Sequence, residues 1–485
     1  MLKKYIQSFK NLPLPMRASI FFMLCSFVQK GISIITTPIF TRILSTAEYG
    51  EYSVFYSWLQ ILAPIICLNL YSGVYSQGIV KFEEERDKFT STLQGLMLSL
   101  VLVWTLVYLG TKDFWNNLFG FSTHQMVAMF LMIWASGVFS FWAMSKRVDY
   151  KYQKLVTITL IVAVVQPTLS IVLISVSEDK VSARIWGVAF IQLVFYGGMF
   201  ISQMFKGKKF FSKKYWKYAL KFNIPLLPHY ISLTILSSSD RIMIERMVGP
   251  DAAGIYNLAY SVSLIMMIFN TALLQTIEPW IYRKIKENKV MEVAKVAYPC
   301  FFIIALLNIL LIMLAPEVIS IFAPASYSEA IWIVPGVALS VFFTFLYTFF
   351  ATFEFYFEKT KYIAGATVGG AILNIFLNYI CIQKYGYIAA GYTTLFSYVL
   401  FAVLHYVFMR KICKRYLNDI KPYDLRVIVG IAIGIIVLGF GFMAIYRTPV
   451  IRYSLMVVTI IVLFFLRKKI ISIMKMFIGI KKNKA

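Results

Sequence analysis

Long runs of apolar residues follow one another along almost the whole chain, separated by short polar segments. Each run is long enough to cross about 30 Å of hydrocarbon as a helix. Fourteen runs are expected to span a membrane, at residues 18–41, 52–73, 91–111, 125–144, 155–176, 183–205, 222–244, 254–277, 295–316, 330–353, 363–383, 389–409, 426–446 and 450–466. The pattern therefore predicts an all-α polytopic membrane protein with about fourteen transmembrane helices.

The composition supports this class and argues against an enzyme. The chain is 60% hydrophobic and 14% charged, with a mean hydropathy of +0.73, whereas a soluble domain is roughly half apolar and about a quarter charged. The sequence offers no paired carboxylates in a sizeable loop, no metal-spaced set of His and Cys, and no glycine-rich phosphate loop. Catalytic residues, metal ligands and cofactors are therefore not expected. The five cysteines, which are expected to pack rather than to pair, are Cys25, Cys67, Cys300, Cys381 and Cys413.

The net charge of +26 is distributed unevenly. If the N-terminus is cytoplasmic, most of the 48 Lys and Arg residues fall on cytoplasmic segments, which is the positive-inside pattern of bacterial inner-membrane proteins. Both termini are then cytoplasmic, and the first span is expected to be retained because its apolar core is longer than that of a signal peptide. The basic residues act mainly as orientation signals and can also contact anionic lipid heads. Nucleic-acid binding is disfavoured because no basic cluster is interleaved with aromatic residues in a soluble module.

An internal repeat relates the two halves of the chain at an offset of 204 residues. Five residues of one motif recur without a gap in the other, as Arg42/Arg246, Gly50/Gly254, Tyr52/Tyr256, Tyr56/Tyr260 and Ser57/Ser261. Spans three to six fall on spans nine to twelve in the same register. We therefore expect an N-terminal six-helix lobe at 1–214, a C-terminal six-helix lobe at 215–418, and two extra helices with a basic tail at 419–485.

An even number of spans in each repeat gives both lobes the same orientation in the membrane. Residues 18–205 should then superpose on residues 222–409 by rotation about the membrane normal. Two such lobes around a central cavity favour alternating access by a carrier. A channel would need a ring of equivalent pore-lining groups, which identical subunits usually supply.

Three segments resemble the polysaccharide-transporter family, the Wzx-type O-antigen flippases. They are the stretch from Lys30 to Ser53, the segment Asn223-Ile-Pro-Leu-Leu-Pro, and the segments Asp240-Arg241-Ile and Gly254-Ile-Tyr-Asn-Leu-Ala-Tyr that follow it. The resemblance implies the multidrug/oligosaccharidyl-lipid/polysaccharide (MOP) exporter fold, which is MATE-like, and a substrate of undecaprenyl-diphosphate-linked oligosaccharide. It further implies flipping from the cytoplasmic to the periplasmic leaflet, with membrane lipids, a polysaccharide polymerase and a chain-length regulator as candidate partners. Many relatives have about twelve spans, so the resemblance does not explain the last pair.

Lys30 is the most informative candidate for the substrate site. It lies near the middle of the first span, where an uncompensated charge costs roughly 2.5–3.5 kcal/mol. It is interpreted as a cavity cation that binds the diphosphate. The alternatives are a structural ion pair or a lysine that extends to the membrane surface.

Other polar residues near the span ends have two interpretations each. Arg42 and Arg246 either bind substrate or hold a loop through backbone carbonyls. Asp240, Arg241 and Glu245 form either a gate between the lobes or a structural ion pair, since Arg241 and Glu245 are one helical turn apart.

The remaining candidates are polar residues inside or at the end of apolar runs. His229 either senses pH and binds sugar or is a hydrogen-bonded packing residue. Asn374 and Asn378, one turn apart, either line the cavity or bond between helices. Glu278 and Glu354 end spans at the inner face. They either carry protons in a coupled cycle or are simply solvated, and solvation is the expectation. The pairs Gly365/Gly369 and Gly430/Gly434 predict close helix packing.

A cation-coupled, MATE-like multidrug antiporter is the alternative function. Such a carrier needs an intramembrane carboxylate to exchange a proton or sodium ion for a cationic drug. The spans hold almost no central Asp or Glu, whereas Lys30 is well centred. The charge pattern therefore favours an anionic cargo.

Overall fold

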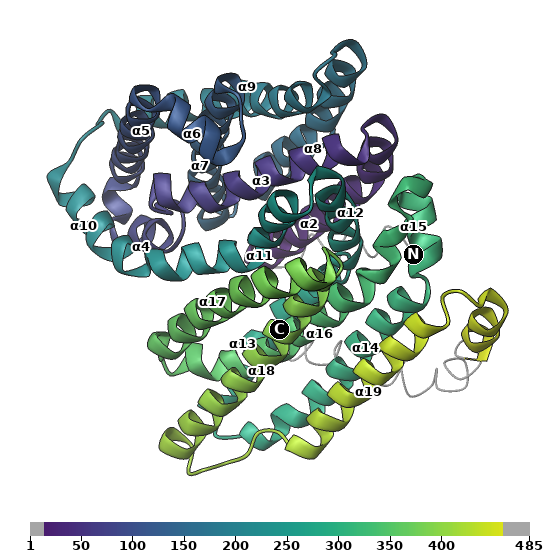
Figure 1. Ribbon diagram of the computed structural model, residues 1–485. Coiled ribbons are helices and arrows are strands. Elements are labelled where there is room, and N and C mark those ends of the chain that lie inside the picture. The colour runs from purple at the N-terminus through teal and green to yellow at the C-terminus, as the bar shows by residue number, and fades with distance from the viewer. Residues whose placement is uncertain (1–13, 459–485) are drawn as a thin grey trace, which may run out of the picture. The chain divides into compact units, whose positions relative to one another are not determined.

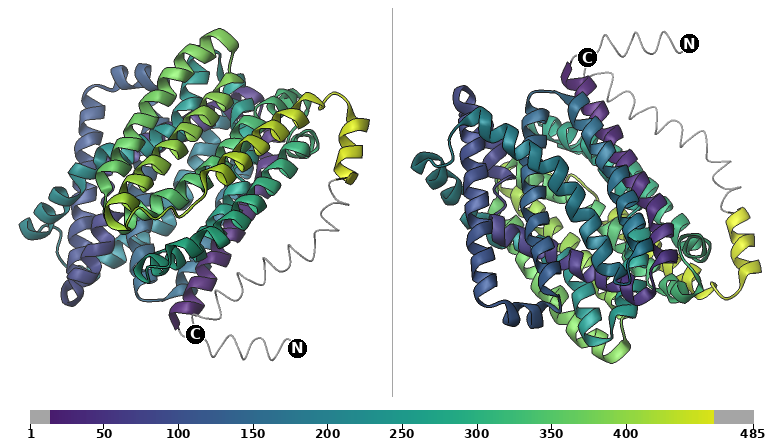
Figure 2. Two further views of the ribbon diagram at one scale, coloured as in Figure 1. Left: turned by 90° about the horizontal axis from the view of Figure 1, so that it is seen from below. Right: turned by 90° about the horizontal axis from the view of Figure 1, so that it is seen from above.

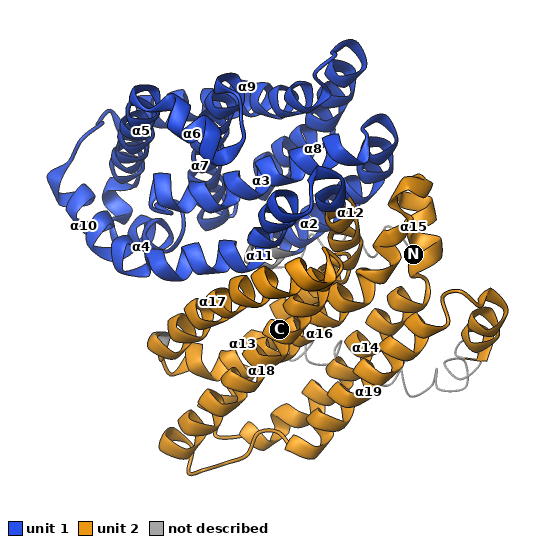
Figure 3. Ribbon diagram, viewed as in Figure 1, with its two compact units in different colours: residues 1–254 blue, residues 255–485 orange. Residues whose placement is uncertain are grey.

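The computed structural model describes residues 14–458, in which all regular secondary structure is helical. The chain forms two compact units, Met1–Gly254 and Ile255–Ala485 (Figure 3). These units are defined by packing, and the lobe boundary expected at residue 214 stays a prediction.

Unit 1 is built from long helices joined by short ones (Figure 1). Its helices are α2 (Leu14–Ile43), α3 (Thr46–Cys67), α4 (Gly73–Lys81), α5 (Arg86–Gly110), α6 (Lys112–Phe119), α7 (Thr123–Val148), α8 (Tyr152–Val176), α9 (Lys180–Gly207), α10 (Lys213–Asn223), α11 (Leu227–Met247) and the start of α12 (Pro250–Ser263). Helix α9 packs against α5, α7 and α8, while α2 packs on α8 and α3 on α11. Aromatic rings fill the centre, where Tyr75 and Phe141 meet edge to face with centroids 4.7 Å apart.

Unit 2 is a bundle around one buried helix. Its helices are α13 (Met266–Lys286), α14 (Val293–Met313), α15 (Ala315–Phe322), α16 (Val334–Tyr356), α17 (Thr360–Tyr385), α18 (Ala389–Tyr416), α19 (Leu425–Ala444) and a short helix at Pro449–Val458. Figures 1 and 2 show α14, α16, α17, α18 and α19 as long, nearly parallel rods. Helix α16 is apolar on all sides and buried along most of its length, against α18, α14 and α13, as expected of a helix with no polar face.

Eleven helices of residues 14–458 are long and apolar enough to cross a membrane. The sequence predicted fourteen. Two of the missing spans are α3 and α11, which carry too many polar residues, such as Glu51 and Asp240, to meet a hydropathy criterion. These two polar helices pack against each other. The last predicted span, 450–466, lies partly outside the described residues.

Candidate functional site

Helix α2 carries Lys30 on a polar stripe. Ser26, Lys30, Ser33 and Thr37 follow one another at the i, i+4, i+7 and i+11 positions, which share one face of a helix. The hydroxyls of Ser26 and Thr37 donate to backbone carbonyls one turn earlier, at 3.0 and 2.8 Å. Lys30 itself is exposed and forms no salt bridge within the described part of unit 1. The ammonium group is therefore available to an external anion.

The opposite face of α2 is apolar and equally open. It presents Leu24, Val28, Ile35 and Ile39, of which Ile35 is 68% exposed. A third face packs on α8. Lipid suits the apolar face, because burying a charge in hydrocarbon is costly. The stripe that carries Lys30 consequently points away from lipid.

The repeated motif brings two glycines into contact within unit 1. A Cβ added to Gly50 on α3 would lie 1.9 Å from the Pro250 carbonyl oxygen, and one added to Gly254 on α12 would lie 2.1 Å from the Thr46 carbonyl oxygen. Thr46 and Pro250 differ by 204 residues, as Gly50 and Gly254 do. The two motif copies thus cross with local twofold symmetry. Only glycine permits so close an approach of the backbones.

The GxxxG pairs, in contrast, do not mark close packing, and that prediction was wrong. No atom of the described residues lies within 4 Å of a Cβ added at Gly365, Gly369, Gly430 or Gly434. Three of these four, all except Gly434, lie on exposed helix faces. Small residues allow close packing only where a second helix covers them.

The two repeat-equivalent arginines contact backbone carbonyls. Arg42 Nη1 donates to the Pro38 carbonyl at 2.9 Å, one turn earlier in α2. Arg246 Nη2 donates to the Leu118 carbonyl at the end of α6, and its guanidinium carbon lies 5.9 Å from the centroid of the Trp58 ring. Both side chains are exposed. The Arg246 contact joins α11 to the end of α6, whereas the Arg42 contact stays within α2. The substrate role of both residues stays a prediction.

Asp240, Arg241 and Glu245 lie on α11 in two different surroundings. Asp240 and Arg241 are buried, and Arg241 Nη1 donates to the Ser237 carbonyl at 2.8 Å. Glu245 is only partly buried and lines a polar pocket of about 220 Å³ together with Glu51 of α3. Two carboxylates therefore share one opening of unit 1, close to the glycine crossing in sequence.

His229 lies at the start of α11 and is half-buried. Its ring centroid is 5.8 Å from that of Tyr230. Its Nδ1 is buried and has no hydrogen-bond partner among residues 14–458. The role of His229 stays a prediction.

Arg184 of α9 is a cation that the sequence reasoning overlooked. Its guanidinium carbon lies 4.0 Å from the Phe40 ring centroid and 3.6 Å from that of Tyr52, with Tyr49 at 5.4 Å. Cation–π contacts of this kind stabilise a charge in an apolar setting. The available signal was an arginine at the start of an apolar run, whereas its contact with the tyrosines of α3 depends on the packing of α9 on α3.

Asn374 and Asn378 form a network between α17 and α18. Both are completely buried. Asn378 Nδ2 donates to Asn374 Oδ1 at 3.2 Å, the Thr393 hydroxyl donates to Asn378 Oδ1, and Asn374 Nδ2 lies 3.5 Å from the Ser397 hydroxyl. The geometry is that of interhelical hydrogen bonding.

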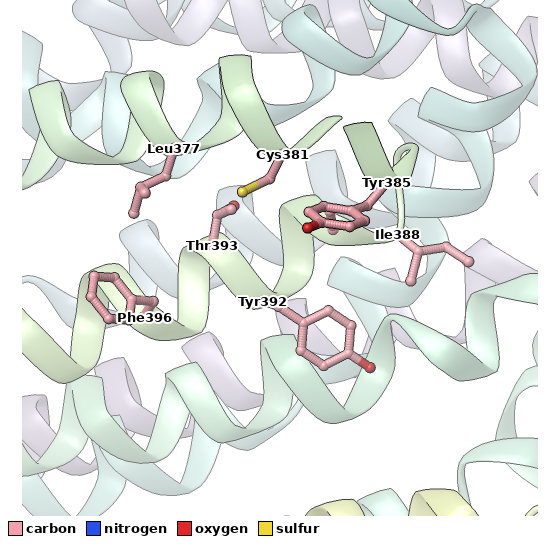
Figure 4. Close-up of a pocket in the computed structure, with 8 residues that line it drawn as sticks. Leu377, Cys381, Tyr385, Ile388, Tyr392, Thr393 and Phe396 are labelled. Carbon is pink, nitrogen blue, oxygen red and sulfur yellow. The ribbon is translucent and has the colours of Figure 1, made fainter. Parts of the chain in front are cut away.

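An apolar pocket lies next to this network. It encloses about 600 Å³ and is lined by residues of α17, α18 and the turn between them (Figure 4). Figure 4 shows Thr393 facing the pocket beside Cys381, with the rings of Tyr385 and Tyr392 toward one end and Phe396 at the other. Its lining suits an acyl or isoprenoid chain rather than a sugar.

Glu354 of α16 is not solvated, so that prediction was wrong. The Glu354 carboxylate is completely buried and lies 2.7 Å from Nδ1 of His405 on α18, which is 1% exposed. The Tyr347 ring stacks on the imidazole at 5.2 Å, and Phe401 meets it edge-on at 4.6 Å. Glu278, the other span-end carboxylate, is only partly buried.

No group of three or more His, Cys, Asp or Glu residues suited to a metal ion is found within residues 14–458. The five cysteines are unpaired thiols, and four of them are buried.

Residues 16–285 match the family model described as "Polysaccharide biosynthesis protein". A curated relative, "Lsg locus putative protein 1" of Haemophilus influenzae, is 25% identical over 210 residues, covering 41% of this chain. The chain spans about half of that relative's length, 51%.

Solved structures with the same fold are far more distant in sequence. The lipid II flippase MurJ in an inward closed conformation has a TM-score of 0.64 at 16% identity, covering 89% of this chain and 100% of that one. An inward-facing multidrug resistance MATE family transporter of the MOP superfamily has a TM-score of 0.62 at 13% identity, covering 80% and 95%. The outward-facing MATE form has a TM-score of 0.57 at 13% identity, covering 83% and 96%. The chain therefore belongs to the polysaccharide biosynthesis protein family, and it has the same fold as MurJ and the MATE transporter.

Proposed function

We propose that this protein flips an undecaprenyl-diphosphate-linked oligosaccharide from the cytoplasmic to the periplasmic leaflet of a bacterial inner membrane, for assembly of O antigen, capsule or exopolysaccharide. The observation that carries the proposal is the exposed Lys30 on a polar stripe opposite the apolar face of α2. Family membership supports the transport of a polysaccharide precursor.

The substrate has three chemically different parts. Its diphosphate is anionic, and Lys30 offers a mobile point charge with three donors. Its glycan is rich in hydroxyls, which the polar groups beside Lys30 can meet. Its long apolar tail can remain in lipid.

Alternating access is supported by the crossing of Gly50 and Gly254. The two motif copies are related by a local twofold within unit 1, and the arrangement of the lobes at 1–214 and 215–418 stays a prediction. A crossing between glycines can separate and re-form without side chains to repack. We assign to this crossing the contact that closes the cavity at the predicted periplasmic end. The polymerase and chain-length regulator would receive the product at that end.

A cation-coupled multidrug antiporter is the second candidate, favoured by one observation. The buried Glu354 supplies the carboxylate that such a carrier needs, and MATE transporters share the fold. His405, however, already occupies this carboxylate. The flippase remains the better-supported function.

The test replaces Lys30 in a strain that lacks its chromosomal copy of the gene. We expect Lys30→Ala to abolish surface polysaccharide and Lys30→Arg to retain most of it, because the phosphate site needs a cation rather than an ammonium group as such. Ile35→Ala, on the exposed apolar face of the same helix, is the control and should export nearly normally.

Membrane fractions would verify that all variants insert equally, and drug susceptibility would be measured in the same strains. Normal export by Lys30→Ala would rule out the cation role. A change confined to drug susceptibility would favour the antiporter.

A further inference from the structure

The segment between α9 and α11 is strongly basic. Residues 206–221 contain seven lysines, and no acidic residue occurs from 180 to 239. It connects the end of one long apolar helix to the start of the next long helix, so it lies at the membrane surface. Large apolar side chains are exposed in the same segment, including Phe205 at 72%, Phe211 at 55% and Ile224 at 52%.

One face of α10 is fixed to unit 1. Tyr215, Ala219 and Asn223 are buried at i, i+4 and i+8. The Tyr215 hydroxyl donates to the Glu85 carboxylate, and Asn223 Nδ2 donates to the Leu68 carbonyl at 2.8 Å. Helix α10 is therefore held in a defined orientation.

The segment that precedes α10 is anchored as well. Ser91 of α5 donates to the Lys209 carbonyl at 2.8 Å, and a Cβ on Gly95 would lie 2.2 Å from the Phe210 carbonyl oxygen. The chain is thus tied to α5 before α10 and to the Leu68 carbonyl at the end of α10, so the lysines of α10 are presented on a rigid support.

The opposite face of α10 carries a stripe of lysines. Lys213, Lys217 and Lys221 are exposed at i, i+4 and i+8. With the apolar side chains of Phe211, Trp216, Leu220 and Ile224 they line a groove of about 760 Å³. Trp216 is pinned in this groove because its Nε1 donates to the Thr92 carbonyl at 2.9 Å.

We propose that this groove, called here the α10 groove, binds the phosphate head of an anionic membrane phospholipid. Three lysines in a row meet the phosphate, while the apolar strip beside them lies against the upper acyl chain, as in an amphipathic helix that rests in the interface. An acidic soluble partner would need the charge but not the exposed apolar strip. The assignment does not depend on the transported cargo.

The experiment places the full-length protein in nanodiscs of unlabelled phosphatidylcholine with a small fraction of brominated phosphatidylglycerol or brominated phosphatidylcholine. The signal of Trp216 is obtained by subtracting the Trp216→Phe variant, since the chain holds 9 tryptophans. We expect the anionic brominated lipid to quench Trp216 more than the zwitterionic one. The excess should fall as salt rises.

The charge is tested with matched variants. The triple variant K213Q/K217Q/K221Q should lose most of the excess quenching, and K213R/K217R/K221R should keep it. The control K154Q/K411Q/K414Q removes three exposed lysines elsewhere and should keep it too. Equal quenching by the two lipids in the unaltered protein, or an undiminished excess in the glutamine variant, would overturn the proposal.

Discussion

Unit 1 and unit 2 keep their ionisable side chains in different places. Unit 1 holds Lys30 on an open face and Glu51 with Glu245 in a pocket, and Asp240 and Arg241 are its buried exception. Unit 2 pairs the ionisable groups that it buries. Glu354 is paired with His405, and Glu317 of α15 with Arg452, which is 3% exposed, although the Glu317 side chain is itself 30% exposed.

The repeat allows a second comparison, in which its two copies are compared position by position. Lys30 corresponds to Thr234, whose hydroxyl bonds the Ile231 carbonyl at 2.8 Å. Ser170, buried against Gly187 between α8 and α9, corresponds to Asn374, buried in the amide network between α17 and α18. At these equivalent positions, the first copy of the repeat carries an exposed charge, whereas the second copy carries uncharged polar side chains that bond within the protein. Because Thr234 lies in unit 1 as Lys30 does, this comparison contrasts the two copies of the repeat and not the two units. Under the proposed function, the first copy meets the anionic head.

The largest effect is expected when the buried pair of unit 2 is broken. Glu354→Ala leaves the His405 imidazole buried without its partner, which costs roughly 3–5 kcal/mol and lowers the melting temperature of the detergent-solubilised protein by about 10 °C. Glu245→Ala in unit 1 is the control and should change it little, because that carboxylate is partly solvated. Differential scanning fluorimetry measures both.

A double variant tests whether the stability of unit 2 depends on the Glu354–His405 pair itself or on side chains that fill the same volume. Glu354→Leu with His405→Phe should recover most of the lost stability, since apolar residues of similar volume often replace a buried pair at no cost. If Glu354→Ala melts like the unaltered protein, unit 2 does not depend on its buried pair and the contrast between the units fails.

Hydropathy predicted the class and most of the helices because a bilayer requires long apolar runs. It also placed α3 and α11 in the membrane although their polar residues, such as Glu51 and Asp240, exclude them from a strict hydropathy criterion. The short helix α10 was not predicted, since an amphipathic surface helix has no long apolar run.

The candidate site was only partly accessible from the sequence. Lys30 stood out because a charge in the middle of an apolar run is rare. The pair of Glu354 and His405 did not, because its members lie 51 residues apart and meet only through the packing of α16 on α18. The crossing of Gly50 and Gly254 was signalled by the repeat, but which glycines approach a backbone depends on which faces are covered.

A smaller effect is expected at the glycine crossing. Gly50→Ala forces a methyl group against the Pro250 carbonyl and should lower the free energy of unfolding by about 1–3 kcal/mol. If the crossing closes and opens during transport, export of polysaccharide should fall more than this loss of stability alone would cause. Gly365→Ala is the matched control on α17. It meets no described atom within 4 Å and should be neutral or stabilising by up to ~1 kcal/mol. Equal behaviour of the two variants would contradict the role of the crossing.

The smallest effect should come from making the interface of unit 2 resemble that of unit 1. Asn374→Ser places the residue of the equivalent position 170 between α17 and α18 and removes the amide contacts to Asn378 and Ser397. Interhelical hydrogen bonds in membranes average about 0.6 kcal/mol, so the melting temperature should fall by only one or two degrees. The reverse change, Ser170→Asn, should cost more, because the Ser170 hydroxyl already lies 2.6 Å from the position of a Cβ on Gly187. A larger loss of melting temperature from Asn374→Ser than from Ser170→Asn would mean that the amide network between α17 and α18 matters more for stability than the close packing between α8 and α9.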